Sequence, residues 1–189
     1  MHSLTTPYTP LSPYSLKIPP HTLTHPCTSV RPLTPRLQAL LVGLRFPSLD
    51  VPQGVRVLTA HFALRLEEME TGACNLSIGV ELADDSQPFP RYPHSHHDPR
   101  HTVASRPRSA STVTWFDANG TSRGIGTTLG SPNIAELIQH VVDRPGWTAG
   151  NHLTLLISGT GRRAFDGAFG AAPELAVYYL PPTSHTLVM

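Results

Sequence analysis

The chain of 189 residues has little cysteine. Two cysteines, Cys27 and Cys74, are too few for a disulfide framework or a zinc site made of thiolates. Cys74 fits the inward face of a strand, where a buried thiol behaves as a small apolar side chain. Pairing of Cys74 with Cys27 would require that the chain enter an oxidising compartment.

Charge is also scarce. Charged residues make up 14% of the chain, the net charge is +1, and Lys17 is the only lysine. The arginines are scattered and form no stripe with interleaved aromatic residues. The field around the molecule is therefore too weak to attract nucleic acid or an anionic membrane, and we expect no nucleic-acid partner.

Long apolar runs are missing. No stretch of about 18 apolar residues exists, so we expect no membrane span. The first residues lack an apolar core segment, so we expect no secretory signal peptide in this chain. The motifs of common enzyme classes are missing too, because the chain has no G-x-S-x-G, no H-E-x-x-H and no P-loop. We therefore expect no catalytic residues and interpret the protein as a non-enzyme.

Proline, in contrast, is abundant, with 20 residues. Eight of them fall within the first 36 residues, among Ser, Thr, His and Tyr. Proline lacks a backbone donor and biases its predecessor toward extended geometry, so we expect neither a helix nor a paired strand there. Residues 1–37 are predicted to be a disordered tail and residues 181–189 a C-terminal tail.

Hydrophobic periodicity between these tails predicts one domain over residues 38–180. "LQALLVGLRF" is a continuous apolar run, typical of a strand buried on both faces. "VRVLTAHFALRLEE" alternates well, with Leu58, Ala60, Phe62, Leu64 and Leu66 on one face. "CNLSIGVELA" follows after the short "ETGA" turn, so the two segments are predicted to form an antiparallel hairpin.

Further strands are predicted at "STVTWF", "LTLLIS" and "ELAVYY". One helix precedes the last two strands. Asn133 could cap it, Glu136 could complete a capping box, and Pro145 follows its end. Short strands, frequent turns and a single helix predict an all-β fold, an antiparallel β-sandwich with one short helix.

Residues 85–108 interrupt this pattern and are predicted to be a disordered insertion. Within it, "PHSHHDPRH" carries a set of candidate metal ligands: His94, His96, His97, Asp98 and His101. Imidazole suits zinc and copper, but metal sites draw their ligands from elements with a fixed geometry. We therefore interpret the segment as a polar loop rather than a metal site. Asp84 and Asp85, just before it, are expected to be solvated residues at a strand end.

Several segments together resemble a known family: "VGLRFPSLDVPQG", "SRPRSASTVTWF", "PNIAELIQHVVDRPGWTAGNHLTLLISGTG" and "AFDGAFGAAPELAVYY". They are similar to the DNRLRE-type, carbohydrate-binding-like jelly-roll modules of secreted surface proteins, over about residues 40–179. The resemblance implies a non-catalytic jelly roll in an extracellular or cell-surface protein. It also implies a glycan or extracellular-matrix partner, and it is compatible with a structural calcium ion. Two departures are the Pro-rich tail, which replaces the leading strands, and the His-rich insertion.

Candidate ligand-binding residues come from loops near aromatic side chains. Trp115 and Trp147 are the only tryptophans, and a flat indole face stacks well on a sugar. We expect Trp147 in the core beneath the helix, whereas Trp115 fits either a ligand contact or packing on a strand. Arg162, Arg163 and Asp166 stand before the last strand, where they could hydrogen-bond a polyol or an anionic glycan. The candidate site is therefore Trp115, Arg162, Arg163 and Asp166.

The sequence supports two functional hypotheses. The first is glycan binding or matrix adhesion, and the alternative is a structural or protein-interaction β-sandwich without a carbohydrate ligand. Two N-glycosylation sequons, at Asn75 and Asn119, would be accessible if the chain were secreted. Asn75 is expected on the outward face of its strand and Asn119 in a loop.

Overall fold

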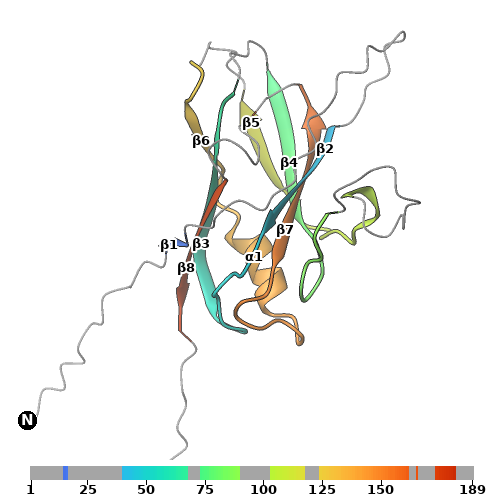
Figure 1. Cartoon of the computed structure of the whole chain (residues 1–189), viewed down its shortest axis with the longest axis vertical. Coiled ribbons are helices and arrows are strands. Elements are labelled where there is room, and N and C mark those ends of the chain that lie inside the picture. Colours follow the sequence, from blue (N-terminus) through green and yellow to red (C-terminus); the bar gives the residue numbers. More distant parts are fainter. Residues whose placement is uncertain are drawn as a thin grey trace, which may run out of the picture.

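Two antiparallel sheets packed face to face form the body of the molecule in the computed structural model (Figure 1). The structure describes residues 15–16, 40–67, 73–89, 103–117, 124–161, 165 and 173–181. The predicted all-β sandwich with one short helix is confirmed.

Four strands make up each sheet in the described part of the chain. One sheet has the order β1-β8-β3-β6, formed by β1 (Ser15–Leu16), β8 (Glu174–Leu180), β3 (Arg56–Arg65) and β6 (Thr128–Gly130). The other has the order β2-β7-β4-β5, formed by β2 (Leu40–Phe46), β7 (Leu153–Thr160), β4 (Cys74–Val80) and β5 (Val113–Asp117). A short 3-10 helix, η2 (Val103–Ser105), and the helix α1 (Ala135–Val142) complete the described elements.

The strand order is that of a jelly roll. Strands β1 and β8, β2 and β7, β3 and β6, and β4 and β5 pair with one another, all antiparallel. These four pairs correspond to one long antiparallel hairpin. The further pairs β3–β8 and β4–β7 join strands of this hairpin side by side, so that it folds into two sheets. Rolling brings the apolar faces of both sheets together over one core.

The buried residues of β3 alternate as the sequence predicts, except at the start of the strand. Ala60, Phe62 and Leu64 are buried between the sheets. A β-bulge lies between Val57 and Thr59 in the pairing with β8. A bulge inserts an extra residue and shifts the phase of the alternation. Val57 therefore packs against the core, and the prediction that Leu58 shares the face of Phe62 is wrong.

The predicted hairpin of "VRVLTAHFALRLEE" and "CNLSIGVELA" is also wrong. β3 pairs with β8 and β6, whereas β4 lies in the opposite sheet between β7 and β5. The chain crosses from one sheet to the other between these strands. Both strands have a buried face, and placing them in opposite sheets buries those faces against each other. A short connection is compatible with either arrangement, so the sequence did not distinguish them.

The helix α1 closes one end of the sandwich, because it packs against β3 in one sheet and β4 in the other (Figure 1). Leu137, Ile138, Val141 and Val142 form its buried face. The N-cap position belongs to Ile134, whose side chain forms no cap, so the capping box with Glu136 is not formed. The predicted capping role of Asn133 is confirmed in part. Asn133 lies one residue earlier, and its Oδ1 accepts hydrogen bonds from the N–H groups of Ala60 and Ala135. It therefore ties the start of the helix to β3.

The predicted strand at "LQALLVGLRF" is β2, an edge strand that pairs with β7. Leu44 and Phe46 are buried in the core. The opposite face is covered in part, because Gly43 lies against the ring of Phe89, whereas Arg45 stays half-buried. The expectation of burial on both faces holds only where that neighbouring segment covers the strand.

One short strand arises from the Pro-rich tail. Ser15 and Leu16 form β1, which pairs with Ala176 and Leu175 of β8. The prediction that no paired strand forms before residue 37 is therefore wrong at these two residues. No helix in the part of the chain that the structure describes is long and apolar enough to cross a membrane.

Candidate functional site

Trp115 is a half-buried residue of β5 that packs against the core. Strand β5 lies toward the end of the sandwich away from α1 (Figure 1). The ring of Trp115 is nearly perpendicular to the ring of Phe62 from the facing sheet, with centroids 5.4 Å apart. On another side it is stacked with Phe165, at 6.5 Å and an interplanar angle of 19°. Trp115 thus joins both sheets and the segment that precedes β8.

Leu66 binds two further segments near Trp115, one that contains Phe165 and one that contains Gly126 and Thr127. It forms an isolated bridge with Phe165. Its backbone N–H donates to the carbonyl of Thr127, and its own carbonyl accepts from the N–H of Gly126. Ile125, next to this turn, is 69% exposed. We call the surface around Leu66, Trp115, Ile125 and Phe165 the loop end.

The four candidate ligand-binding residues have different outcomes. Trp115 is described, and its contacts with Phe62 and Phe165 show that it packs within the sandwich. Arg162, Arg163 and Asp166 lie outside the described residues. They flank Phe165 in the sequence, and the stacking of Phe165 on Trp115 fixes that point of the segment at the loop end. No local pattern in the sequence predicted the contact of Phe165 with Trp115.

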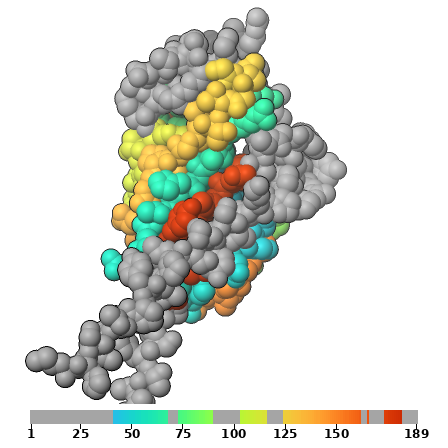
Figure 2. Space-filling view, turned by 90° about the vertical axis from the view of Figure 1, so that its left-hand side faces the viewer, coloured from blue at the N-terminus to red at the C-terminus, as the bar shows by residue number. Residues whose placement is uncertain are grey.

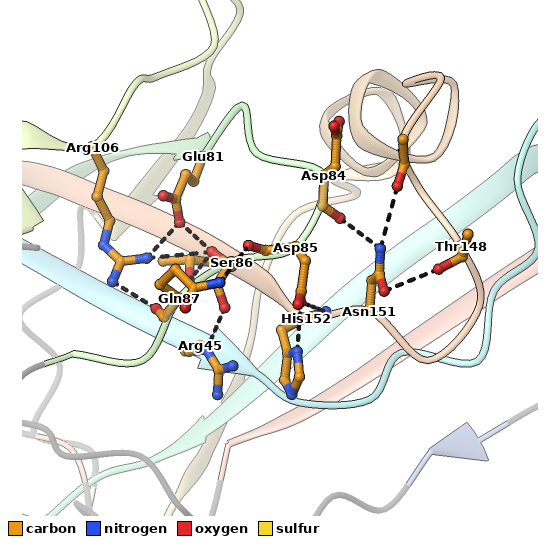
Figure 3. Close-up of polar contacts among 12 residues, drawn as sticks. Arg45, Glu81, Asp84, Asp85, Ser86, Gln87, Arg106, Thr148, Asn151 and His152 are labelled. Atoms are coloured by element: carbon orange, nitrogen blue, oxygen red, sulfur yellow. Dashed lines mark hydrogen bonds and ion pairs between the residues drawn. The ribbon is translucent and has the colours of Figure 1, made fainter.

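A second group of side chains forms a polar cluster that the sequence did not predict (Figure 3). It covers the outer side of the sheet β2-β7-β4-β5. At its centre, Nη1 of Arg106 lies 2.6 Å from Oε2 of Glu81. The hydroxyl of Ser86 donates to Glu81 and also contacts Oγ1 of Thr154, at 2.7 Å. These side chains are all buried, so the ion pair is shielded from water.

Arg106 also holds neighbouring backbone. Its Nη2 donates to the carbonyl of Gln87 at 2.7 Å, and its guanidinium lies 4.2 Å from the ring centroid of Phe89. A cation over an aromatic face is attracted by the ring quadrupole. Arg106 therefore attaches its own segment to the segment of Gln87 and Phe89. These are the two ends from which the His-rich stretch departs.

Asp85 and His152 form an adjoining pair at the surface (Figure 3). Oδ1 of Asp85 accepts from Nδ1 of His152 at 2.6 Å and from its backbone N–H at 2.9 Å. Partial burial raises the pKa of Asp85, but these hydrogen bonds and the charges of His152 and Arg45 outweigh burial. The pKa of this carboxyl is therefore lowered. Burial lowers the pKa of Arg45, whose Nε donates to the carbonyl of Ser86.

Asp84 is also paired, since its Oδ1 lies 2.6 Å from Nε of Arg144, which follows α1. Its carbonyl accepts from the side-chain amide of Asn151 at 3.0 Å. Asp84 and Asp85 are partly exposed to solvent, as expected, but each also binds a residue that is distant in sequence. Both carboxylates connect the end of β4 to the segment between α1 and β7, which is close in space but distant in sequence.

The polar cluster has the contacts of a structural network. Glu81 and Asp84 form ion pairs with Arg106 and Arg144, and Asp85 accepts a hydrogen bond from the ring of His152. Among the described residues, no group of three or more His, Cys, Asp or Glu is arranged to hold a metal ion. The histidines and Asp98 of "PHSHHDPRH" lie outside the described residues, so their interpretation as a polar loop stays a prediction.

Other predicted positions agree with the structure. Trp147 is fully buried, and its Nε1 donates to the carbonyl of Val51 at 2.8 Å, which confirms its place in the core. Cys74 is buried, as predicted. Asn75 is exposed on β4, so the first sequon is accessible on the outward face as expected. Cys27 and Asn119 lie outside the described residues.

Comparison of the chain with protein-family models, with curated proteins and with solved structures found no match.

Proposed function

We propose that the chain is a non-enzymatic module of an extracellular or cell-surface protein that binds a glycan or a matrix component at the loop end. One observation carries the proposal, the stacked contact between Phe165 and Trp115. Arg162, Arg163 and Asp166 flank Phe165 in the sequence, so charged residues that can hydrogen-bond a glycan stand next to an aromatic residue of the loop end along the chain.

The mechanism combines an apolar base with polar contacts. The ring of Trp115 packs against the rings of Phe62 and Phe165, so Trp115 supports the site and does not contact the ligand itself. Ile125 offers exposed apolar surface for the C–H face of a sugar ring. Arginine donates in a planar fork to hydroxyl or carboxylate oxygens, and an aspartate accepts from sugar hydroxyls.

Two further points support the proposal. The chain resembles carbohydrate-binding-like jelly-roll modules, and the strand order is that of a jelly roll. Jelly rolls include lectin domains, although a fold by itself does not define a function. Glu81 and Asp84 are engaged in ion pairs with arginines and Asp85 in a hydrogen bond with His152, and this supports a structural role for these carboxylates.

A glycan array with the full chain tests the proposal. We expect binding to a restricted set of glycans and a loss of at least about tenfold in affinity for the Arg162→Ala/Arg163→Ala double variant, since two charge-assisted contacts are removed. Arg56→Ala is the matched control, because Arg56 is exposed at the opposite end of β3. Equal affinity of the double variant and wild type would contradict a site at the loop end.

The second candidate function is adhesion to a protein partner without a carbohydrate ligand. It is favoured by the 69% exposure of Ile125, because an exposed apolar side chain commonly marks a protein contact when neighbouring apolar surface accompanies it. A blank glycan array, together with binding to purified matrix proteins that Ile125→Ser weakens, would favour this candidate. Matrix binding that Ile125→Ser leaves unchanged would exclude Ile125 from the interface.

A further inference from the structure

We propose that Arg45 and His152, positioned by Ser86 and Asp85, bind a sulfate ester of a sulfated polysaccharide. We call Arg45, Asp85 and His152 the anion site. It borders the polar cluster on the outer side of the sheet β2-β7-β4-β5 and contains none of the loop-end residues (Figure 3). The inference adds a second ligand contact to the proposed function, so it rests on that function for the class of ligand.

The register of the sheet brings the two side chains to the same face. Arg45 lies directly opposite Thr154 of β7, and residues opposite each other share a face of the sheet. His152 precedes Thr154 by two residues, so it lies on that face as well. Diagonal neighbours of this kind are about 7–8 Å apart, which is within reach of a long side chain. One small ligand group can therefore contact both residues.

Asp85 fixes the orientation of the His152 ring. Nδ1 of His152 lies 2.6 Å from Oδ1 of Asp85. An ionised carboxylate only accepts hydrogen bonds, so Nδ1 carries the proton and Nε2 is left for another partner. Among the described residues, Nε2 has no such partner. Figure 3 shows the free ends of His152 and Arg45 pointing the same way, away from the centre of the polar cluster.

The guanidinium of Arg45 is positioned but not fully paired. Its Nε donates to the carbonyl of Ser86 at 2.8 Å, which directs the two Nη groups outward. In the part of the chain that the structure describes, neither Nη group has a hydrogen-bond partner, and no carboxylate forms an ion pair with Arg45. The side chain is half-buried, and burial lowers its pKa despite the nearby charge of Asp85. An anion at the Nη groups therefore stabilises a partly desolvated charge.

The number of donors favours a sulfate ester over a carboxylate. The two Nη groups of Arg45 and a protonated Nε2 of His152 supply three donors from two directions. A sulfate ester has three terminal oxygens that these donors can share. The two oxygens of a carboxylate are satisfied by the guanidinium fork alone, which leaves the ring without a role.

The charge of the site favours a sulfate ester over a phosphate monoester. With His152 protonated, the three residues of the anion site together carry a single positive charge. A sulfate ester carries a single negative charge and neutralises it. A phosphate monoester carries about −1.5 to −2 at neutral pH, and Asp85 repels the excess.

Protonation of His152 couples binding to pH. The charged groups that face its ring are Asp85, from the segment after β4, and Arg45 of β2. Glu81 and Arg106, at the centre of the polar cluster, form an ion pair with each other. The pKa of Asp85 is lowered, so this carboxylate stays ionised while histidine titrates. We therefore expect tighter binding at a pH of about 5.5 than at about 8.

Titration of the full chain with dextran sulfate tests the site, and unsulfated dextran is the control ligand. We expect Arg45→Lys to bind at least about tenfold more weakly, because lysine keeps the charge but lacks the fork of two donors. Arg56→Lys is the matched control, since Arg56 is the exposed first residue of β3 in the opposite sheet. Figure 2 shows the face of that sheet, where β8, in red, runs beside β3. Equal affinity of the two variants would show that overall charge determines binding and would overturn the inference.

His152→Asn tests the other half of the site. Asparagine can donate to Asp85 as Nδ1 does, but it has no counterpart of Nε2. We expect the affinity for dextran sulfate to fall about three- to tenfold and its dependence on pH to disappear. The same pH dependence in the variant and wild type would exclude His152 from the site and overturn the inference.

Nuclear magnetic resonance keeps the test decisive if a variant fails to fold. In the wild-type chain, a short dextran sulfate oligosaccharide should shift the signals of the Arg45 side chain and of the His152 ring. The unsulfated oligosaccharide should leave them in place. Unchanged signals at both residues with the sulfated ligand in excess would overturn the inference.

The Arg162→Ala/Arg163→Ala variant separates the anion site from the loop end. We expect this variant to keep the binding of dextran sulfate that depends on Arg45. Loss of binding in the double variant, with wild-type binding by Arg45→Lys, would overturn the inference and leave the loop-end site standing. Loss in Arg45→Lys alone supports the anion site and shows that the loop end does not bind this ligand.

Inorganic sulfate distinguishes an ester from the free anion. We expect it to compete only weakly with dextran sulfate, because Asp85 repels its second negative charge. Full competition at the same concentration of sulfate groups would assign the site to the free anion and overturn the ester.

Discussion

Several polar side chains in the described part of the sandwich bind backbone groups at the ends and irregular points of strands. Gln139 of α1 donates to the carbonyl of Val55 and accepts from the N–H of Val57, beside the bulge in β3. Ser109 accepts from the N–H of Val80, where β4 ends. A buried backbone group without a partner costs free energy, so these side chains stabilise the irregular points of the sheets.

The Asp85–His152 pair predicts how stability depends on pH. Folding lowers the pKa of Asp85, so the unfolded state binds more protons in the acid range. The stabilisation from this carboxylate is complete above its ordinary pKa of about 4 and is lost as the pH falls through the lower folded pKa. We expect Asp85→Asn to flatten the dependence of the free energy of unfolding on pH between about 5 and 2, measured by urea denaturation. The same slope in the variant and wild type would show that the pair contributes nothing.

The burial of some single residues could be predicted from the sequence, whereas that of others could not. Trp147 and Cys74 were assigned correctly to the core, because burial of a large apolar ring or of a thiol follows from hydrophobicity alone. Arg106 and Glu81 were missed, because charged residues are expected at the surface unless a partner is known. Arg106 and Glu81 are 25 residues apart, and the residues around Arg106 show no periodicity, so the sequence did not reveal that the two side chains pair.

At the scale of the elements, β7 is an inner strand of its sheet. It pairs with β2 on one side and with β4 on the other. Gly159 lies in this strand, and a Cβ added there would overlap the backbone carbonyl oxygen of Asn75 and approach Cα of Leu76. Backbone atoms of a paired strand cannot move aside as a flexible side chain can. The glycine therefore permits the close approach of β4 to β7.

We expect Gly159→Ala to destabilise the fold by roughly 1–3 kcal/mol, in the range of overpacked interiors. Gly130→Ala is the control, because a Cβ at Gly130 in β6 meets nothing within 4 Å. Thermal unfolding should show a lower midpoint for the first variant and little change for the second. Similar midpoints for the two variants would contradict the steric argument.

Elements were predicted better than their pairing. The strands and the helix follow from local alternation and from one apolar stripe, which neighbouring residues determine. Pairing depends on contacts between distant residues, such as those between β3 and β8. A short turn between two alternating segments therefore predicted a hairpin, although β3 and β4 lie in opposite sheets.

On the scale of the whole molecule, the polar cluster attaches two segments to the outer side of one sheet. Arg106 binds Glu81, the carbonyl of Gln87 and the ring of Phe89. Beneath them, Thr154 and Leu156 of β7 are buried although they alternate with the core-facing residues of that strand. The covering segments thus exclude water from a face that a two-layer sandwich would leave exposed.

We expect Arg106→Met to cost about 3–5 kcal/mol, because it leaves the carboxylate of Glu81 buried without a cation. Glu81→Gln in the same chain should restore part of this loss, since the uncompensated charge is removed. Arg108→Met is the control, because Arg108 is exposed and should change stability by less than about 0.5 kcal/mol. Urea denaturation measures all three, and an equal effect at Arg106 and Arg108 would show that the buried pair is not stabilising.

The sequence by itself determined the class of fold, the core residues of most strands and the position of the helix, because these depend on the spacing of apolar residues along the chain. Only the tertiary structure decided the jelly-roll pairing, the stacking of Phe165 on Trp115 and the burial of Arg106 with Glu81. Each of these joins residues that are far apart in the sequence, and their stability comes from mutual burial, which no local pattern records.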